Sequence, residues 1–211
     1  MYLVPVHLHF CSCGAGGTGL SPLEIAAALF GAWSVWLSVR QKILSWPTAI
    51  VNVVLYAIVF YQAKLYADMG LQVIYAGLSI YGWYEWLYGG EGRTELHVSR
   101  TPRVFAIRVL LIGVASAVLL GSLLRRTTDA ALPFMDSALT SASLAAQWMM
   151  TRKLLENWLV WITVDVFYVG MFIYKGLCVT ALLYAVFLAL AVKGWLDWRR
   201  SMRAESARHA T

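Results

Sequence analysis

Residues 156–165 read Glu156-Asn157-Trp158-Leu159-Val160-Trp161-Ile162-Thr163-Val164-Asp165 and open an apolar run that is long enough to cross a lipid bilayer. On a helix, residues three and four positions apart share a face, so one stripe contains Trp158, Trp161, Asp165, Tyr168 and Phe172. An ionisable group at membrane depth is costly unless it faces the interior of a bundle or an aqueous cavity. Asp165 therefore indicates a transport pathway or a binding site, and the competing interpretation is a hydrogen bond between helices.

The composition is that of a protein with several membrane-spanning helices. Of the 211 residues, 60% are hydrophobic and 13% are charged, and the mean hydropathy is +0.66. The net charge of +6 could indicate nucleic-acid binding, but the basic residues form short clusters between apolar runs, as membrane topology requires. The cysteines, Cys11, Cys13 and Cys178, have neither a paired framework nor the spacing of zinc ligands, so no metal site is expected.

Seven segments have the length and apolar character of a membrane span, which needs about 20 residues. We expect these spans at residues 22–39, 47–63, 68–88, 104–124, 134–151, 156–175 and 177–198. Ser21-Pro22 and Trp46-Pro47 are typical helix starts, because proline at the first helical position loses no hydrogen bond. Residues 1–20 lack the basic region of a cleaved signal peptide and are interpreted as an extension.

Basic residues indicate how the spans are oriented. If the amino terminus lies outside the cell, 13 of the 17 Lys and Arg residues fall on the cytoplasmic side, and those outside are Lys64, Arg125, Arg126 and Lys175. The positive-inside rule then predicts a periplasmic amino terminus and a cytoplasmic carboxyl terminus. Glu91, Glu95 and His97 fall in the longest inner loop, which we expect to be solvated.

The chain repeats itself at a shift of 112 positions. This shift superimposes Trp46 on Trp158, Tyr56 on Tyr168 and Gly82-Trp83 on Gly194-Trp195 without a gap, which indicates a duplicated three-span unit. We predict an all-α membrane protein with seven transmembrane helices in a three-plus-one-plus-three order and parallel internal repeats. The expected segments are an extension (1–20), a first unit (21–88), an inner loop and linker helix (89–130), a second unit (131–200) and a cytoplasmic tail (201–211).

The two units differ where a specific site would need asymmetry. Trp161 is opposite Ala49, Asp165 is opposite Val53, and Asn52 is opposite Val164. Bulk and charge on one side and a small residue on the other predict a pocket beside an indole, whereas drift after duplication would create none. Other polar residues that could bind a ligand within the spans are Gln72, Tyr75, Gln147 and Asn157. For any single one of them, a hydrogen bond between helices is the simpler interpretation.

The ends of the third and seventh spans are rich in aromatic residues. Residues 81–86 and 194–198 are typical of an aromatic belt that anchors helices at the inner membrane interface. The sequence contains no nucleophile–base pair, phosphate-binding glycine loop or metal cluster placed for chemistry. We therefore expect neither an enzyme nor a bound cofactor.

Several motifs are familiar in combination: Trp46-Pro47 followed by Tyr56, Leu65-Tyr66-Ala67-Asp68-Met69, Leu71-Gln72-Val73, Tyr81-Gly82-Trp83, and residues 156–162 with Asp165. Together, from about Ser34 to Trp198, they resemble the nicotinamide riboside transporter (PnuC) family of bacterial inner membranes. The resemblance implies a fold similar to a full-length SWEET transporter, a homotrimer, and facilitated diffusion rather than pumping. It also implies that a cytoplasmic kinase then traps the riboside.

The resemblance also implies which residues bind the substrate. In that family the paired tryptophans of the sixth span and polar residues of the third and sixth contact it, which here implies Trp158, Trp161, Asp165 and Gln72. A flat cationic ring suits two indoles and a carboxylate, so nicotinamide riboside is the first expectation and thiamine the second. Riboflavin is neutral and gains nothing from Asp165, and a phosphorylated nucleotide would be repelled. A channel-like or structural membrane protein is the alternative from another class.

Overall fold

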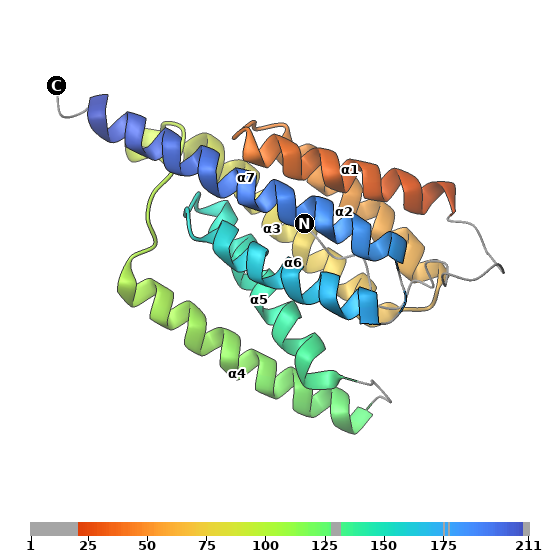
Figure 1. Ribbon diagram of the computed structural model, residues 1–211. Coiled ribbons are helices and arrows are strands. Elements are labelled where there is room, and N and C mark those ends of the chain that lie inside the picture. The colour runs from red at the N-terminus through yellow and green to blue at the C-terminus, as the bar shows by residue number, and fades with distance from the viewer. Residues whose placement is uncertain (1–20, 128–131, 175, 177, 209–211) are drawn as a thin grey trace.

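The computed structural model describes residues 21–127, 132–174, 176 and 178–208, and this part of the chain is predominantly helical (Figure 1). Its α-helices are α1 (Pro22–Val39), α2 (Ser45–Gln62), α3 (Tyr66–Tyr88), α4 (Arg103–Thr127), α5 (Pro133–Thr151), α6 (Asn157–Tyr174) and α7 (Cys178–Arg208), with a 3₁₀-helix η1 (Glu91–Arg93) after α3. The predicted all-α fold with seven helices is confirmed. The predicted extension at residues 1–20 lies outside the described residues.

Five of these helices, α1, α2, α4, α6 and α7, are long and apolar enough to cross a membrane by length and composition. The two remaining helices, α3 and α5, carry polar side chains that are buried, among them Gln72, Ser79, Ser137, Ser143 and Gln147. Polar groups at membrane depth are sheltered when they face the interior of a bundle. The two less apolar helices therefore turn their polar groups inward.

Local signals place the first helix as the sequence predicted. Ser21 Oγ accepts a hydrogen bond from the Glu24 backbone N–H (3.2 Å), and Glu24 Oε2 accepts one from the Ser21 N–H (2.8 Å). This capping box satisfies donors that the start of a helix leaves free, and Pro22 occupies the first turn. The second expected start, at Trp46-Pro47, falls within the first turn of α2.

Helices α1–α3 and α5–α7 pack into a bundle, while α4 runs along its outside (Figure 1). Helix α4 packs against α5, where Ser116 Oγ and Ser141 Oγ are 3.0 Å apart. A Cβ on Gly121 would overlap the ring of Phe134, so this glycine allows the close approach. The rest of α4 presents apolar side chains such as Leu119, which is 71% exposed.

The two three-helix units share a tryptophan contact at the same positions of the repeat. The rings of Trp46 and Trp86 meet edge to face, with centroids 5.3 Å apart, and those of Trp158 and Trp198 do so at 5.4 Å. A Cβ on Gly82 would overlap the Trp46 ring, and one on Gly194 would overlap that of Trp158. The glycine and tryptophan matches between the units thus have a packing cause, which supports the interpretation of a duplication.

Trp86 and Trp198 also connect the two units to each other. The Trp86 Nε1–H donates to the Met150 carbonyl (3.0 Å), and the Trp198 Nε1–H donates to the Ser38 carbonyl (3.1 Å), again at equivalent positions. The two rings have centroids 5.9 Å apart and are 2% and 0% exposed. The predicted aromatic belt is therefore wrong for these residues, because a buried indole that finds a carbonyl acceptor is most stable inside the protein.

Two corners of the chain also recur at the same spacing. Gln41 and Lys153, after the first helix of each unit, have φ angles of 53° and 47°. Lys64 and Gly176, after the second helix, have φ angles of 59° and 71°. Left-handed backbone is uncommon outside glycine, so its recurrence in both units is a second structural sign of the duplication.

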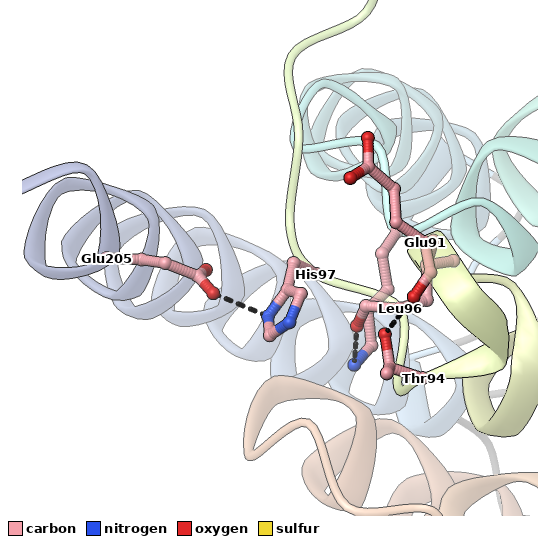
Figure 2. A network of polar contacts seen from close by, with 6 residues as sticks. Glu91, Thr94, Leu96, His97 and Glu205 are labelled. Carbon is pink, nitrogen blue, oxygen red and sulfur yellow. Dashed lines mark hydrogen bonds and ion pairs between the residues drawn. The ribbon is translucent and has the colours of Figure 1, made fainter. Parts of the chain in front are cut away.

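The loop that follows α3 is held against the bundle (Figure 2). Lys153 Nζ donates to the Leu96 carbonyl (2.7 Å), and Ser99 exchanges backbone hydrogen bonds with Lys153 and Leu155 (3.2 and 2.8 Å). Burial lowers the pKa of Lys153, and the nearby Glu95 and Glu205 act in the opposite direction. Glu91, Glu95 and His97 are exposed, as expected of a solvated loop, whereas the backbone of Leu96 and Ser99 is bonded to the bundle.

Helix α7 also differs from its expected length. The seventh span was expected to end at residue 198, with a tail after residue 200, but the helix continues to Arg208. Its last turns bring Glu205 Oε1 to 2.6 Å from Nδ1 of His97 (Figure 2). A polar contact with the loop thus supports the helix beyond the apolar stretch that the hydropathy pattern could identify.

Candidate substrate site

The stripe that the sequence placed on one face of α6 faces the protein interior. Trp158, Trp161 and Asp165 have no exposed surface, and Tyr168 and Phe172 are 2% and 1% exposed. The rings of Tyr168 and Phe172 stack with centroids 5.8 Å apart. Helix α6 therefore directs its acidic residue and these aromatic residues into the bundle, as predicted.

Asp165 is the electrostatic anomaly of this stripe. Its side chain is fully buried, and neither carboxylate oxygen has a hydrogen-bond partner among the described residues. Desolvating an unpaired carboxylate costs several kcal/mol, and buried polar groups in native proteins nearly always have a partner. The competing interpretation of Asp165, a hydrogen bond between helices, is therefore not seen among the described residues. A ligand that brings a positive charge or a donor would remove the penalty.

The surroundings of Asp165 come from α3, α5 and α6. The Tyr168 hydroxyl lies within electrostatic reach of Asp165 and of two further carboxylates, those of Asp136 on α5 and Asp68 on α3. The Tyr75 hydroxyl on α3 lies near Tyr168 and near Ser143 on α5, but it has no hydrogen-bond partner among the described residues. The three helices thus gather phenols, a hydroxyl and carboxylates in one region.

The predicted polar residues Gln72, Tyr75 and Gln147 belong to the same helix faces. They are 3%, 1% and 1% exposed, and Gln72 lies one turn before Tyr75 on α3, while Gln147 lies one turn after Ser143 on α5. Helix α5 packs against both α3 and α6. Amide, phenol and carboxylate groups in this arrangement could bind the hydroxyls and the charge of a polar ligand.

Trp158 has a different setting from Trp161. The ring of Trp158 packs on Gly194 and Trp198, which is the contact that Trp46 makes in the first unit. Trp161 is equally buried, but its repeat position in the first unit is Ala49. Trp158 is thus part of packing that both units share, and its contact with a substrate stays a prediction.

The two predicted asparagines are used within the protein. Asn52 Nδ2 donates to the Ala27 carbonyl (2.7 Å) and so connects α2 to α1 in the first unit. Asn157 Nδ2 donates to the Leu154 carbonyl (2.5 Å) in the corner before α6, while its Oδ1 has no partner among the described residues. These bonds favour packing roles, and substrate contacts of Asn52 and Asn157 stay predictions.

Sequence reasoning did not single out Asp68 or Asp136 as site residues. Both lie in the first turn of a helix, where an acidic residue is common because it complements the helix dipole. The signal that could have found Asp136 is the repeat, because Asp136 is equivalent to Glu24 and each acid lies within electrostatic reach of the equivalent tyrosine, Tyr168 or Tyr56.

Comparison with known proteins identifies the chain. Residues 21–200 match the model of a protein family described as nicotinamide mononucleotide transporter. The chain belongs to this family. The transporter is 30% identical to the nicotinamide riboside transporter PnuC of Escherichia coli (strain K12), over 92% of each chain. It is 25% identical to PnuC of Neisseria mucosa, over 87% of this chain and 74% of that one.

Two further similarities concern a different vitamin and the fold. The transporter is 24% identical to the riboflavin/roseoflavin transporter RibM of Streptomyces davaonensis, over 87% of each chain. A crystal structure of the vitamin B3 transporter PnuC superimposes with a TM-score of 0.68 and 24% sequence identity, covering 86% of this chain and 82% of that one. The transporter therefore has the PnuC fold, as the motifs implied.

The family and the apolar helices establish what kind of protein this is. It is a multi-pass transporter of the bacterial inner membrane and not an enzyme. The description of the family refers to a mononucleotide, whereas the relatives from Escherichia coli and Neisseria mucosa are named for the riboside. The charges of the site residues are therefore the basis for choosing between a riboside and a mononucleotide as the substrate.

Proposed function

We propose that this transporter carries nicotinamide riboside into the cell. The observation that supports the proposal most strongly is the buried, unpaired Asp165 carboxylate on the same face of α6 as Trp161. The riboside has a flat ring with a fixed positive charge. A carboxylate attracts that charge, and an indole can stack on the ring with a cation–π gain of about 2 kcal/mol when desolvated. The names of the two PnuC relatives point the same way.

Charge also ranks the alternative substrates. Thiamine carries a cationic ring and is the second candidate, and riboflavin, which one distant relative is named for, is neutral. Nicotinamide mononucleotide adds a phosphate to the riboside. Since a second negative group beside Asp165 is repelled and must also be desolvated, we do not expect the mononucleotide to be carried.

We propose that transport is facilitated diffusion, with trapping by a cytoplasmic kinase that phosphorylates the riboside. The positive charge of the substrate keeps the facing Asp165 carboxylate ionised, because an opposite charge a few ångströms away favours the charged form. Asp165 then has no need to carry a proton across the membrane. Phosphorylation in the cytoplasm would keep the inward gradient of the free riboside.

Proteoliposomes containing the purified protein are expected to equilibrate labelled nicotinamide riboside without any ion gradient. Uptake should saturate, unlabelled riboside should compete with it, and the mononucleotide should do neither. Empty liposomes measure the background leak. Flux that rises linearly and ignores competitors would indicate a channel-like protein, and accumulation above the outside concentration under an imposed pH difference would indicate symport.

We propose that the amino terminus faces the periplasm and the carboxyl terminus the cytoplasm, because of the 13-to-4 division of basic residues. A reporter that matures only in the cytoplasm should give signal when fused after Arg200. The same reporter inserted at Lys64, in the corner between α2 and α3, should stay silent. The reverse pattern at the two positions would overturn this orientation.

We also propose that the transporter assembles as a homotrimer, as the resemblance to the PnuC family implies. The surface of α4 supports an oligomer, because only 6% of its membrane-spanning stretch is buried within this chain. Closed symmetric assemblies are the usual form of soluble oligomers, and a threefold ring joins two different surface patches at each contact. Lipid is the alternative occupant of this surface.

A further inference from the structure

The two units differ in how many carboxylates lie near their equivalent tyrosines. In the first unit, Glu24 lies within electrostatic reach of Tyr56, and in the second unit Asp136 lies within reach of the equivalent Tyr168. Tyr168 also has Asp68 and Asp165 nearby. The repeat positions of these two acids are Thr180 and Val53. Tyr168 therefore has three carboxylates within electrostatic reach, one of them (Asp68) from the first unit, whereas the equivalent Tyr56 has Glu24.

The three carboxylates differ in depth. Asp68 lies in the first turn of α3 and Asp136 in the first turn of α5, so both are near helix ends, and both side chains are partly exposed. Asp165 lies in the middle of α6 and is fully buried. Tyr168 follows Asp165 by one helical turn and lies within electrostatic reach of all three acids. Asp68 and Asp136 thus lie near helix ends, and Asp165 lies deeper in the bundle.

Asp165 indicates what this arrangement is for. A fully buried carboxylate whose oxygens have no partner among the described residues lacks a positive charge that a ligand could supply. Two further acids near the same tyrosine make the local potential more negative, and this attracts cations and repels anions. The helix dipole accounts for an acid in the first turn of α3 and of α5, but it does not account for the proximity of both acids and Asp165 to one tyrosine.

We propose that Asp68 and Asp136 form an acidic approach to Asp165 that selects cationic substrates before they reach the buried site. This inference rests on the proposed function, because it assigns a charge filter to the path of the riboside. The filter acts on association with the site. Its signature is therefore a change in KM that depends on substrate charge and on salt, with little change in the maximal rate.

The experiment compares two substrates of nearly the same shape in proteoliposomes. Nicotinamide riboside carries one positive charge, and its 1,4-dihydro form is neutral. In the double variant Asp68→Asn/Asp136→Asn, the KM for the riboside is expected to rise by about tenfold at low ionic strength. The rise should shrink in salt, because screening weakens attraction between charges more than about 8 Å apart. The KM for the dihydro form should stay within about twofold of its original value, since no charge acts on it.

The repeat supplies the matched controls. Glu24→Gln removes a negative charge at the equivalent position of the first unit, and Gln can still complete the capping box with Ser21. This variant should leave both KM values unchanged. Asp136→Glu restores the charge with the residue that the first unit uses, and it should restore the KM of an Asp136→Asn single variant. Abundance in the membrane and a monodisperse profile in detergent confirm that each variant is folded.

Three results would overturn the charge filter: an equal loss for both substrates, no change for either, or an equal effect of Glu24→Gln. Failure of the proposed function looks different. If the unaltered protein takes up thiamine and not the riboside, the proposed substrate is wrong. In that case the double variant should show the same salt-dependent rise in the KM for thiamine, whose ring is also cationic. An unchanged thiamine KM in the double variant would contradict the charge filter.

Discussion

Replacing Asp165 with valine is expected to make the protein more stable and to abolish most of its transport. The same chain already carries a buried valine, Val53, at the equivalent position of the first unit. The change removes a buried carboxylate without a partner. Exchanging a buried charged group for a packed apolar one often stabilises a protein, by about 1–4 kcal/mol. Transport of the riboside should fall at least about tenfold, because the desolvated cation loses its counter-charge.

The measurements are a thermal unfolding curve in detergent without substrate and an uptake assay in proteoliposomes. Thr163→Val is the matched control, because Thr163 is exposed on the outward face of α6 and its hydroxyl bonds only within the helix. That variant should change neither quantity. If the Asp165→Val variant lost stability and kept its uptake, Asp165 would be a residue that connects helices by a hydrogen bond, which is the competing interpretation of the sequence.

The helices and the inward stripe of α6 could be predicted because both depend on local pattern. Apolar runs of sufficient length define spans, and the spacing of Trp161, Asp165 and Tyr168 places them on one face whatever their neighbours are. Burial of the Asp165 side chain then follows from the cost of exposing it to lipid. Which residues surround Asp165 does not follow, because that depends on how α3 and α5 pack against α6.

The aromatic ends of α3 and α7 show why contacts between distant parts of the chain could not be predicted from the sequence. Tryptophans at the end of a span are typical of an interfacial belt, but Trp86 and Trp198 find carbonyl acceptors in the other unit. The partner of Trp86 is Met150, which is distant in sequence, so no local pattern contains the contact. Asp136 was overlooked for a similar reason, since an acid in the first turn of a helix needs no tertiary explanation.

The residues that both units share are different from the residues that occur in one unit only. The tryptophan and glycine contacts recur in both units with nearly equal geometry. The acids Asp68 and Asp165 and the ring of Trp161 have no counterpart, because Thr180, Val53 and Ala49 stand in their places. Packing is thus shared by the two units, while the acids and the indole expected to act on a substrate each occur in one unit only, Asp68 in the first and Asp165 and Trp161 in the second.

This division predicts opposite outcomes for two buried tryptophans on the same face of α6. Trp158→Ala should lower the free energy of unfolding by about 3–5 kcal/mol, because it empties the space between Gly194 and Trp198 in a tightly packed cluster. Trp46→Ala removes the equivalent ring in the first unit and should cost a similar amount. For both variants the expected observation is less folded protein in the membrane and a lower melting temperature.

Trp161→Ala should instead reduce substrate binding by about 1–3 kcal/mol, the usual loss when a ring stacked on an aromatic side chain loses its partner. The space that the indole leaves is continuous with the polar site in this interpretation, so water can fill it and the loss of stability is smaller than for Trp158→Ala. Riboside binding by calorimetry and a melting curve on each of the three variants separate the two roles. If Trp158→Ala kept its melting temperature and lost binding, the Trp158 ring would be a substrate contact. If Trp161→Ala failed to fold, the substrate site would not lie on this stripe.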